Sequence, residues 1–160
     1  MENVTGASGG PAGSYNILVG NGGNVLIGGN GRRNLLAAGG SASTLIGGDD
    51  DILIGGTTAY DQEADLASPS AIMDYWAGSG DDYFTRVNNL PTGNGVPLLD
   101  ATTVVNNGGG NTLLGYGGGA AEMNLFYGLE PSLESTDANP DIGEVFMYVS
   151  YRVRETLSGR

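Results

Sequence analysis

A short hydrophobic phrase recurs along the first third of the chain. Each copy sets three mostly aliphatic residues after a polar one, and the copies begin at Asn16, Asn24, Asn34, Ser43 and Asp51. Their starts are eight, ten, nine and eight residues apart, and glycine-rich turns separate them. Because side chains alternate across a strand, the central leucines are expected to share one face and to stack into one apolar column. The spacing therefore predicts short parallel strands joined by tight turns.

The rest of the chain carries other patterns. Between residues 57 and 95, apolar residues at helical spacing follow Pro69, which suits the first turn of a helix. A second short helix is expected to begin near Tyr83. The repeated phrase returns once, at residues 111–115, and alternating apolar residues in 144–153 predict a C-terminal strand.

These patterns divide one globular domain into four segments. We expect a flexible N-terminal segment (1–15), glycine-rich repeats (16–56), a helical insertion (57–95) and a return to the repeats with C-terminal strands (96–160). Thirty glycines in 160 residues agree with many tight turns, because glycine adopts positive φ without steric cost. The predicted fold class is mainly β: a short, right-handed parallel β-solenoid of the β-roll kind, with an inserted helical segment and C-terminal strands.

The charge balance narrows the range of partners. Eighteen acidic residues face six arginines, with no lysine and no histidine, so the formal net charge is −12. Such a chain repels nucleic acid and anionic membranes. No apolar run approaches the ~20 residues that a membrane-spanning helix needs. We therefore expect no nucleic-acid partner and no membrane span.

The same composition argues against an enzyme. Cysteine and histidine are both absent, which excludes nucleophilic sites of the Ser-His-Asp or Cys-His kind. Paired carboxylates remain, Glu63 with Asp65 and Asp81 with Asp82, but such pairs more often belong to a solvated face. The sequence predicts a non-enzymatic protein.

The glycine-rich repeats resemble the haemolysin-type calcium-binding family, whose pattern is Gly-Gly-x-Gly-x-Asp-x-Leu-x. In that family, glycine carbonyls and the aspartate carboxylate bind calcium between successive turns. Here the aspartate position is filled by Asn16, Asn24, Asn34, Ser43, Asp51 and Asn111. The resemblance implies calcium as a cofactor, and the most acidic turn supplies the candidate ligands Gly47, Asp49, Asp50 and Asp51.

The asparagines at the other positions have a second interpretation. Aligned asparagines in stacked strands form ladders, in which each side chain hydrogen-bonds the next and satisfies the turns without metal. The candidate ladder residues are Asn16, Asn24, Asn34 and Asn111. Hard cations prefer carboxylate oxygens, so the ladder and calcium stay open as alternatives in the first three copies.

The later part of the chain extends the resemblance. The segments 51–61, 111–114, 124–127 and 143–146 look like the C-terminal module of very large, secreted bacterial surface proteins. That resemblance implies an extracellular or cell-surface module that folds outside the cell, serves attachment or export, and is recognised by a type I secretion apparatus. The alternative is a structural subunit with a largely metal-free solenoid and an asparagine ladder. It would self-associate through the open edges of the solenoid and build an extracellular filament, sheath or surface layer.

Overall fold

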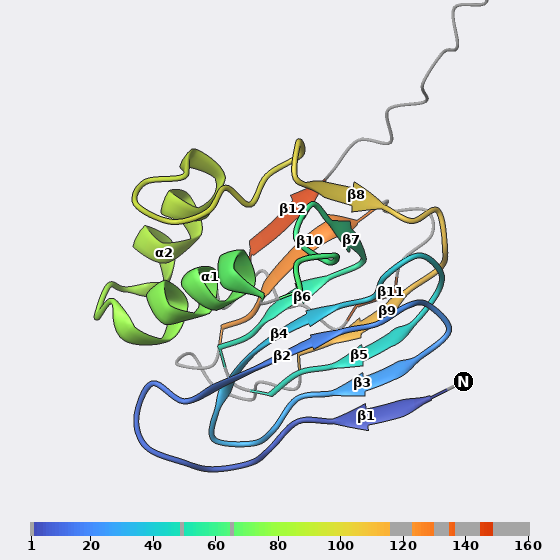
Figure 1. The fold of residues 1–160 in the computed structure, drawn as a ribbon, viewed down its shortest axis with the longest axis horizontal. Helices are drawn as coiled ribbons and strands as arrows, with labels where there is room; N and C mark the ends of the chain where they lie inside the picture. The colour runs from blue at the N-terminus through green and yellow to red at the C-terminus, as the bar shows by residue number, and fades with distance from the viewer. Residues whose placement is uncertain are drawn as a thin grey trace, which may run out of the picture.

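The computed structural model describes residues 2–48, 50–64, 66–115, 123–129, 135–136 and 145–148. In this part of the chain, successive strands alternate between two five-stranded parallel sheets (Figure 1). The first sheet has the strand order β1-β3-β5-β9-β11, and the second has the order β12-β10-β6-β4-β2. From β1 to β6, neighbouring strands of one sheet are therefore two strands apart in the sequence, and β7 and β8 interrupt this alternation before β9.

The strands are short, as the repeated phrase predicts. Those of the first sheet are β1 (Asn3–Thr5), β3 (Val25–Ile27), β5 (Thr44–Ile46), β9 (Thr112–Leu114) and β11 (Ser135–Thr136). Those of the second sheet are β2 (Tyr15–Val19), β4 (Arg33–Ala37), β6 (Ile52–Ile54), β10 (Leu125–Leu129) and β12 (Val145–Tyr148). A separate antiparallel pair joins β7 (Gly56–Thr58) to β8 (Val104–Asn106).

A helical layer lies between β7 and β8 in the sequence. It contains α1 (Ala67–Gly78), α2 (Tyr83–Asn89) and the short 3-10 helix η1 (Leu90–Thr92). Asp82 caps the N-terminus of α2: its side chain accepts a hydrogen bond from the Thr85 backbone N–H at 2.8 Å. Within the described residues, neither helix has the length and the apolar character to cross a membrane.

The core has two parts, one on each face of the second sheet. Between the sheets lies a cluster made of central leucines of the repeats together with Ala38 and Phe126: Leu36, Ala38, Leu45, Leu53, Leu113 and Phe126. On the other face, a larger cluster joins the second sheet to the helices and includes Ile72, Met73 and the fully buried Trp76. The second sheet is thus covered on both sides, as parallel sheets usually are.

The central leucines do not form one column. Strand register places Leu18 beside Leu36 and Leu36 beside Leu53 in the second sheet. In the first sheet, Leu26 lies beside Leu45, and Leu45 lies beside Leu113. Alternate copies of the phrase enter different sheets, so the expected single column is two columns that face each other.

The predicted fold class is wrong. The expected mainly β, right-handed parallel β-solenoid is replaced by a mixed α/β arrangement with about 19% helix and 29% strand. The strands are parallel within each sheet, but the chain leaves the repeats after β6, adds an antiparallel pair and builds a helical layer. That layer shares the larger core cluster with the second sheet, so it is an integral part of the fold.

The N-terminal segment, expected to be flexible, contributes to both sheets. β1 pairs with β3 in the first sheet, and β2 begins at Tyr15. The loop between them contacts the turn after β3, where the Gly29 Cα lies so close to the Ala7 carbonyl that a Cβ would have no room. A side chain at position 29 would therefore displace this loop.

Candidate functional site

The turn between β5 and β6, residues 47–51, was the candidate calcium site. The backbone of Asp50 has φ of 59°, a left-handed conformation that residues other than glycine rarely adopt. Its neighbour Asp51 accepts a hydrogen bond from the backbone N–H of Gly48, which closes the turn on itself. The Gly47 N–H donates to the Leu114 carbonyl at 2.8 Å, and Asp49 lies outside the described residues.

The Asp50 carboxylate is bound by two arginines. Arg86 Nη2 lies 3.0 and 2.9 Å from its two oxygens, and Arg33 Nε lies 2.7 Å from Oδ2. Asp50 and Arg86 are both buried, with 8% and 4% of their surfaces exposed. Removing charges from water is costly unless they are paired, so this carboxylate depends on the guanidinium groups. Two protein side chains therefore neutralise the Asp50 carboxylate.

Trp76 connects the C-terminal part of α1 to the same turn. Its indole N–H donates to the Asp50 carbonyl at 2.7 Å, and the Arg86 guanidinium lies 4.3 Å from its ring centroid. The Trp76 carbonyl accepts hydrogen bonds of 2.8 Å from Nη1 of both Arg33 and Arg86. We call Arg33, Asp50, Trp76 and Arg86 the arginine cluster. It joins the turn to the helical layer.

Asp51 has different partners and is fully buried. Its carboxylate accepts hydrogen bonds from the Asn34 backbone N–H at 2.6 Å and from Asn34 Nδ2 at 3.0 and 3.1 Å. Burial raises the pKa of Asp51 from 3.8 to about 7, and the hydrogen bonds from Gly48 and Asn34 oppose that shift. This carboxylate is therefore sensitive to pH near neutrality.

Asp51 is one member of a line of polar side chains along the second sheet. Asn16 Nδ2 donates to Asn34 Oδ1 at 2.7 Å, and Asn34 donates to Asp51. The Asp51 backbone N–H in turn donates to Asn124 Oδ1 at 2.8 Å. We call these four residues the second-sheet ladder. The links join neighbouring strands and give the buried Asn34, Asp51 and Asn124 hydrogen-bond partners, as buried polar groups require.

A shorter line follows the first sheet. The Ser43 backbone N–H donates to Asn111 Oδ1 at 2.9 Å, and the Asn24 backbone N–H donates to Ser43 Oγ at 3.2 Å. The four asparagines expected to form one ladder are thus divided. Asn16 and Asn34 bond directly in the second sheet, whereas Asn24 and Asn111 are connected through Ser43 in the first.

The two described carboxylates of the candidate calcium site have different partners. Asp50 faces the two arginines, and Asp51 faces Asn34 and the Gly48 N–H. Among the described residues, no group of three or more acidic side chains has an arrangement that could hold a metal ion. Calcium at this turn stays a prediction.

Three of the four paired carboxylates named from the sequence lie in the described structure, where they accept hydrogen bonds. Asp82 caps α2, and the hydrogen bonds from Thr85 lower the pKa of Asp82 below its usual value. Asp81 accepts a hydrogen bond from the Tyr75 hydroxyl at 2.8 Å, and Glu63 accepts one from the Ser68 N–H at 2.8 Å. Asp65 lies outside the described residues.

A second candidate site lies at the free edge of both sheets. Gly20 N donates to the Ala37 carbonyl of β4, so by alternation the N–H and C=O groups of Tyr15, Ile17 and Val19 point away from β4. In β1, Gly6 N donates to the Ile27 carbonyl of β3, so the backbone groups of residues 3 and 5 likewise point outward. No other strand in the described structure pairs with these outer sides of β1 and β2.

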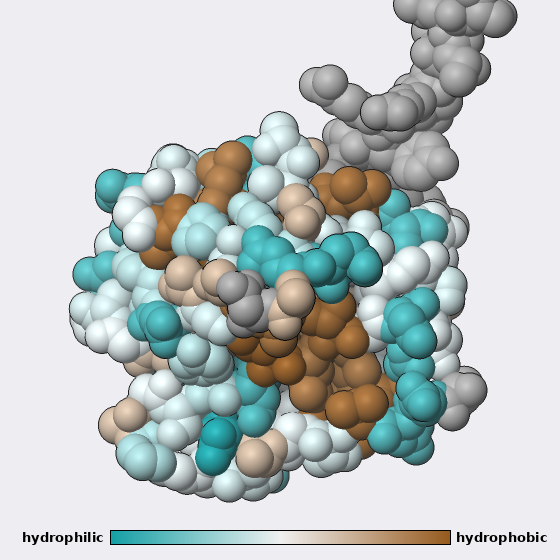
Figure 2. Space-filling model, in the orientation of Figure 1, coloured by the Kyte–Doolittle hydropathy of each residue, from teal (hydrophilic) through white to brown (hydrophobic). Residues whose placement is uncertain are grey.

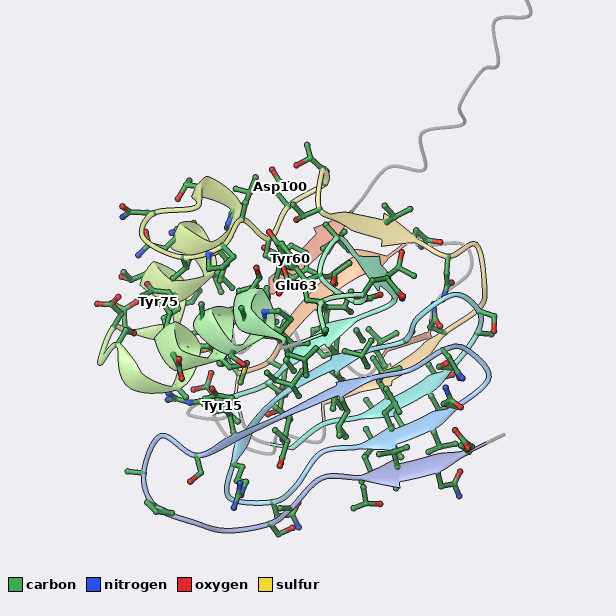
Figure 3. All side chains as sticks on the ribbon, viewed as in Figure 1. Tyr15, Tyr60, Glu63, Tyr75 and Asp100 are labelled. Carbon is green, nitrogen blue, oxygen red and sulfur yellow. The ribbon has the colours of Figure 1, made fainter. Side chains whose placement is uncertain are left out.

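Hydrophobic side chains accompany this free edge. Val4 and Leu18 occupy the first positions of the two inner columns, where Val4 is 40% exposed and Leu18 is half-buried. In the view of Figure 2, hydrophobic residues gather over β2 and the strands beside it. Tyr15 is drawn toward the helices, where its hydroxyl donates to Asp74 at 2.8 Å (Figure 3). We call residues 3–5 and 15–19 the N-terminal edge.

The sequence matches no protein-family model and no curated protein, and the structure matches no solved structure. The resemblance to haemolysin-type calcium-binding repeats therefore stays a prediction.

Sequence reasoning missed the arginine cluster. Arg33 and Arg86 are 17 and 36 residues from Asp50, and no local pattern connects them. One signal was present: Arg32, Arg33 and Arg86 are the only basic residues before position 150, and Arg86 follows the aromatic residues Tyr83 and Phe84. A lone cation beside aromatic residues in a predicted helix is a candidate for a buried ion pair.

Proposed function

We propose that this chain is a non-enzymatic structural protein that assembles by pairing its N-terminal edge with the strands of a second copy. The observation that carries the proposal is the pair of free, parallel sheet edges at β1 and β2, with the exposed Val4 and the half-buried Leu18 between them. Unpaired edge strands are templates for another chain, because each outward N–H and C=O group gains a partner when a strand is added.

The composition of the edge supports this function. Edge strands that must stay single are usually protected by charged residues, by proline or by a bulge. Residues 3–5 and 15–19 contain no charged residue and no proline, although the chain carries 24 charged residues in all. In an acidic protein, an uncharged edge is also the place where two copies meet with the least repulsion.

The other end of the molecule supports a second copy as the partner. In the described part of the chain, β11 is the last strand of the first sheet and β12 is the last strand of the second. Pairing these two strands with β1 and β2 of the next copy would continue both sheets in parallel. Such a head-to-tail contact repeats without closing, so it builds a filament.

Proline substitution on the exposed strand tests this function. Thr5 is exposed, and its backbone N–H points outward, so Thr5→Pro removes an edge donor without removing a core side chain. Thr5→Ala is the matched control, because it removes the side chain and keeps the donor. We expect the wild type and Thr5→Ala to form larger species in sedimentation velocity as concentration rises, and Thr5→Pro to remain smaller. A wild type that stays monomeric throughout would contradict the proposal.

Calcium-dependent folding, type I export and an extracellular location stay predictions from the resemblance. The pairing of Asp50 with Arg33 and Arg86 favours the structural alternative, because an added cation would have to displace two guanidinium groups.

A further inference from the structure

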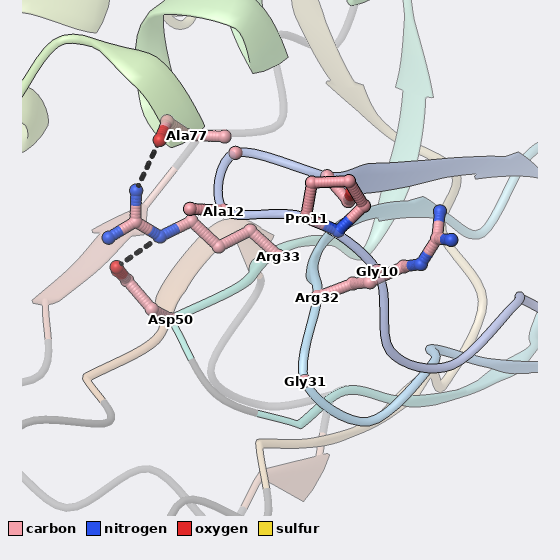
Figure 4. A pocket seen from close by; sticks show the side chains of 10 residues that line it. Gly10, Pro11, Ala12, Gly31, Arg32, Arg33, Asp50 and Ala77 are labelled. Atoms are coloured by element: carbon pink, nitrogen blue, oxygen red, sulfur yellow. Dashed lines mark hydrogen bonds and ion pairs between the residues drawn. The ribbon is translucent and has the colours of Figure 1, made fainter.

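An open cavity lies where the N-terminal loop faces the arginines. Its volume is about 420 Å³, and it is lined by residues 10–14, residues 31–33, Asp50 and Ala77 (Figure 4). Small-molecule sites in proteins commonly have volumes of roughly 300–1,000 Å³. The cavity is therefore large enough for a monosaccharide.

The lining of this cavity is positively charged, although the protein as a whole is negatively charged. The chain has 18 acidic residues and six arginines, yet three of the arginines meet here. Arg32 and Arg33 line the cavity, and Arg86 contacts its wall through Asp50. Among the side chains that line the cavity, Arg32 and Arg33 are cationic and Asp50 is the one carboxylate. The lining therefore has a positive excess in a chain of net charge −12.

Arg32 is the cation that the fold leaves available. Arg33 reaches Asp50 and the Ala77 carbonyl, whereas Arg32 extends in another direction (Figure 4). Arg32 Nε donates to the Gly9 carbonyl, and in the described part of the chain Arg32 forms no ion pair. A guanidinium group with free donors binds a carboxylate through two parallel hydrogen bonds.

The remaining lining defines the kind of anion. It contains no aromatic side chain, and its apolar residues are the small Pro11, Ala12 and Ala77. The Ser14 hydroxyl and the backbone of several glycines supply polar contacts. We propose that this cavity binds a sugar acid of one unit, with its carboxylate on Arg32 and its hydroxyl groups on Ser14 and the glycine backbone. This inference is independent of the assembly proposal.

Calorimetric titration of the full chain with glucuronate tests the inference. We expect saturable binding of glucuronate and none of glucose, which has the same ring without the carboxylate. Arg32→Gln is expected to weaken glucuronate binding at least tenfold. Ala101→Glu is the matched control, because it makes the same change in net charge at an exposed position that does not line the cavity, and it is expected to bind as the wild type does.

Three results would overturn the inference. Equal glucuronate affinity in Arg32→Gln and the wild type would exclude Arg32 as the anchor. Sulfate binding as tight as glucuronate binding would show a bare anion site without sugar contacts. Equal weakening in Ala101→Glu would show that net charge alone is responsible. Circular dichroism of each variant establishes that it is folded. Arg32→Lys keeps the positive charge but loses the paired guanidinium donors, and it is expected to bind glucuronate with intermediate affinity.

Discussion

The acidic turn and the N-terminal edge differ in where their polar groups find partners. At the turn, Asp50 binds two arginines, and Asp51 accepts hydrogen bonds from Asn34 and the Gly48 N–H. Both carboxylates therefore have partners within the chain. At the edge, the outward N–H and C=O groups of β1 and β2 have no strand beside them in the described structure. The two described carboxylates of the acidic turn thus have partners within the chain, whereas the uncharged edge has free backbone donors and acceptors.

The second-sheet ladder sharpens this contrast, because its side chains are satisfied even at the edge. Asn16 donates to the Ala7 carbonyl at 2.9 Å and accepts from the Ala7 N–H at 3.2 Å, so the loop after β1 closes the amide ladder. What remains free at the edge is the backbone. A partner would therefore be recognised by strand pairing and apolar contact, with little contribution from asparagine side chains.

The largest expected effect comes from breaking the arginine cluster. Asp50→Ala leaves Arg86 buried without its carboxylate, and removing one member of a buried ion pair costs about 3–5 kcal/mol. Urea unfolding measures this loss of stability. Asp81→Ala removes an exposed carboxylate as a control and is expected to cost much less. Equal losses in the two variants would show that the cluster does not hold the turn.

A second prediction concerns the pH dependence of stability through Asp51. Its folded-state pKa of about 7 lies above the unfolded value of 3.8, so the folded state binds the proton more tightly. The contribution is complete below pH 3.8 and is lost as pH rises through 7. At 1.36 kcal/mol per pKa unit, the loss is at most roughly 4 kcal/mol.

The matched variant for that prediction is Asp51→Asn, which places at position 51 the amide found at positions 16, 34 and 124. Unfolding free energies at pH 4.5 and 7.5 are compared for the two proteins. The wild type is expected to lose more stability over this interval than the variant. A parallel loss in both proteins would mean that other carboxylates cause it.

Interrupting the ladder is expected to have a smaller effect. Asn34→Ala removes the donor to Asp51 and the acceptor of Asn16, and a buried polar group left without its partner costs about 1–3 kcal/mol. Thermal unfolding measures this loss. Asn94→Ala, at an exposed loop position, serves as the control. An unchanged melting temperature for Asn34→Ala would contradict the structural role of the ladder.

Calcium is expected to have the smallest effect at this turn. A ligand stabilises the folded state only if it binds that state, and the Asp50 and Asp51 carboxylates already have internal partners. The melting temperature is therefore expected to be the same in excess calcium and in chelator. A rise with calcium that disappears in Asp51→Asn would restore the family resemblance as the explanation of this turn.

Local sequence patterns predict the elements better than they predict their arrangement. Leucines at eight- to ten-residue spacing predict short strands, and Pro69 and Tyr83 mark the two helices. The division into two sheets was not predictable, because Leu18 and Leu26 stand in the same phrase although they belong to opposite sheets. Helix α1 also contributes Trp76 to the core and to the Asp50 carbonyl, a contact set by tertiary packing.

The chemistry of the candidate site was only half predictable. The acidic run at residues 49–51 is plain in the sequence, and it suggests a cation. One cation that Asp50 binds is Arg86, and the position of Arg86 beside Asp50 follows from the packing of α2. Similarly, the asparagine positions predict hydrogen-bonded ladders, but their division between two sheets depends on strand order.

Amide hydrogen exchange as a function of protein concentration tests the role of the N-terminal edge most directly. The N–H groups of residues 15, 17 and 19 point outward from β2, so they are expected to exchange quickly in dilute solution. Assembly through this edge predicts that these amides become protected as concentration rises, while the amide of the exposed loop residue Ala101 continues to exchange quickly. Fast exchange at positions 15, 17 and 19 in assembled material, with new protection elsewhere, would contradict the account.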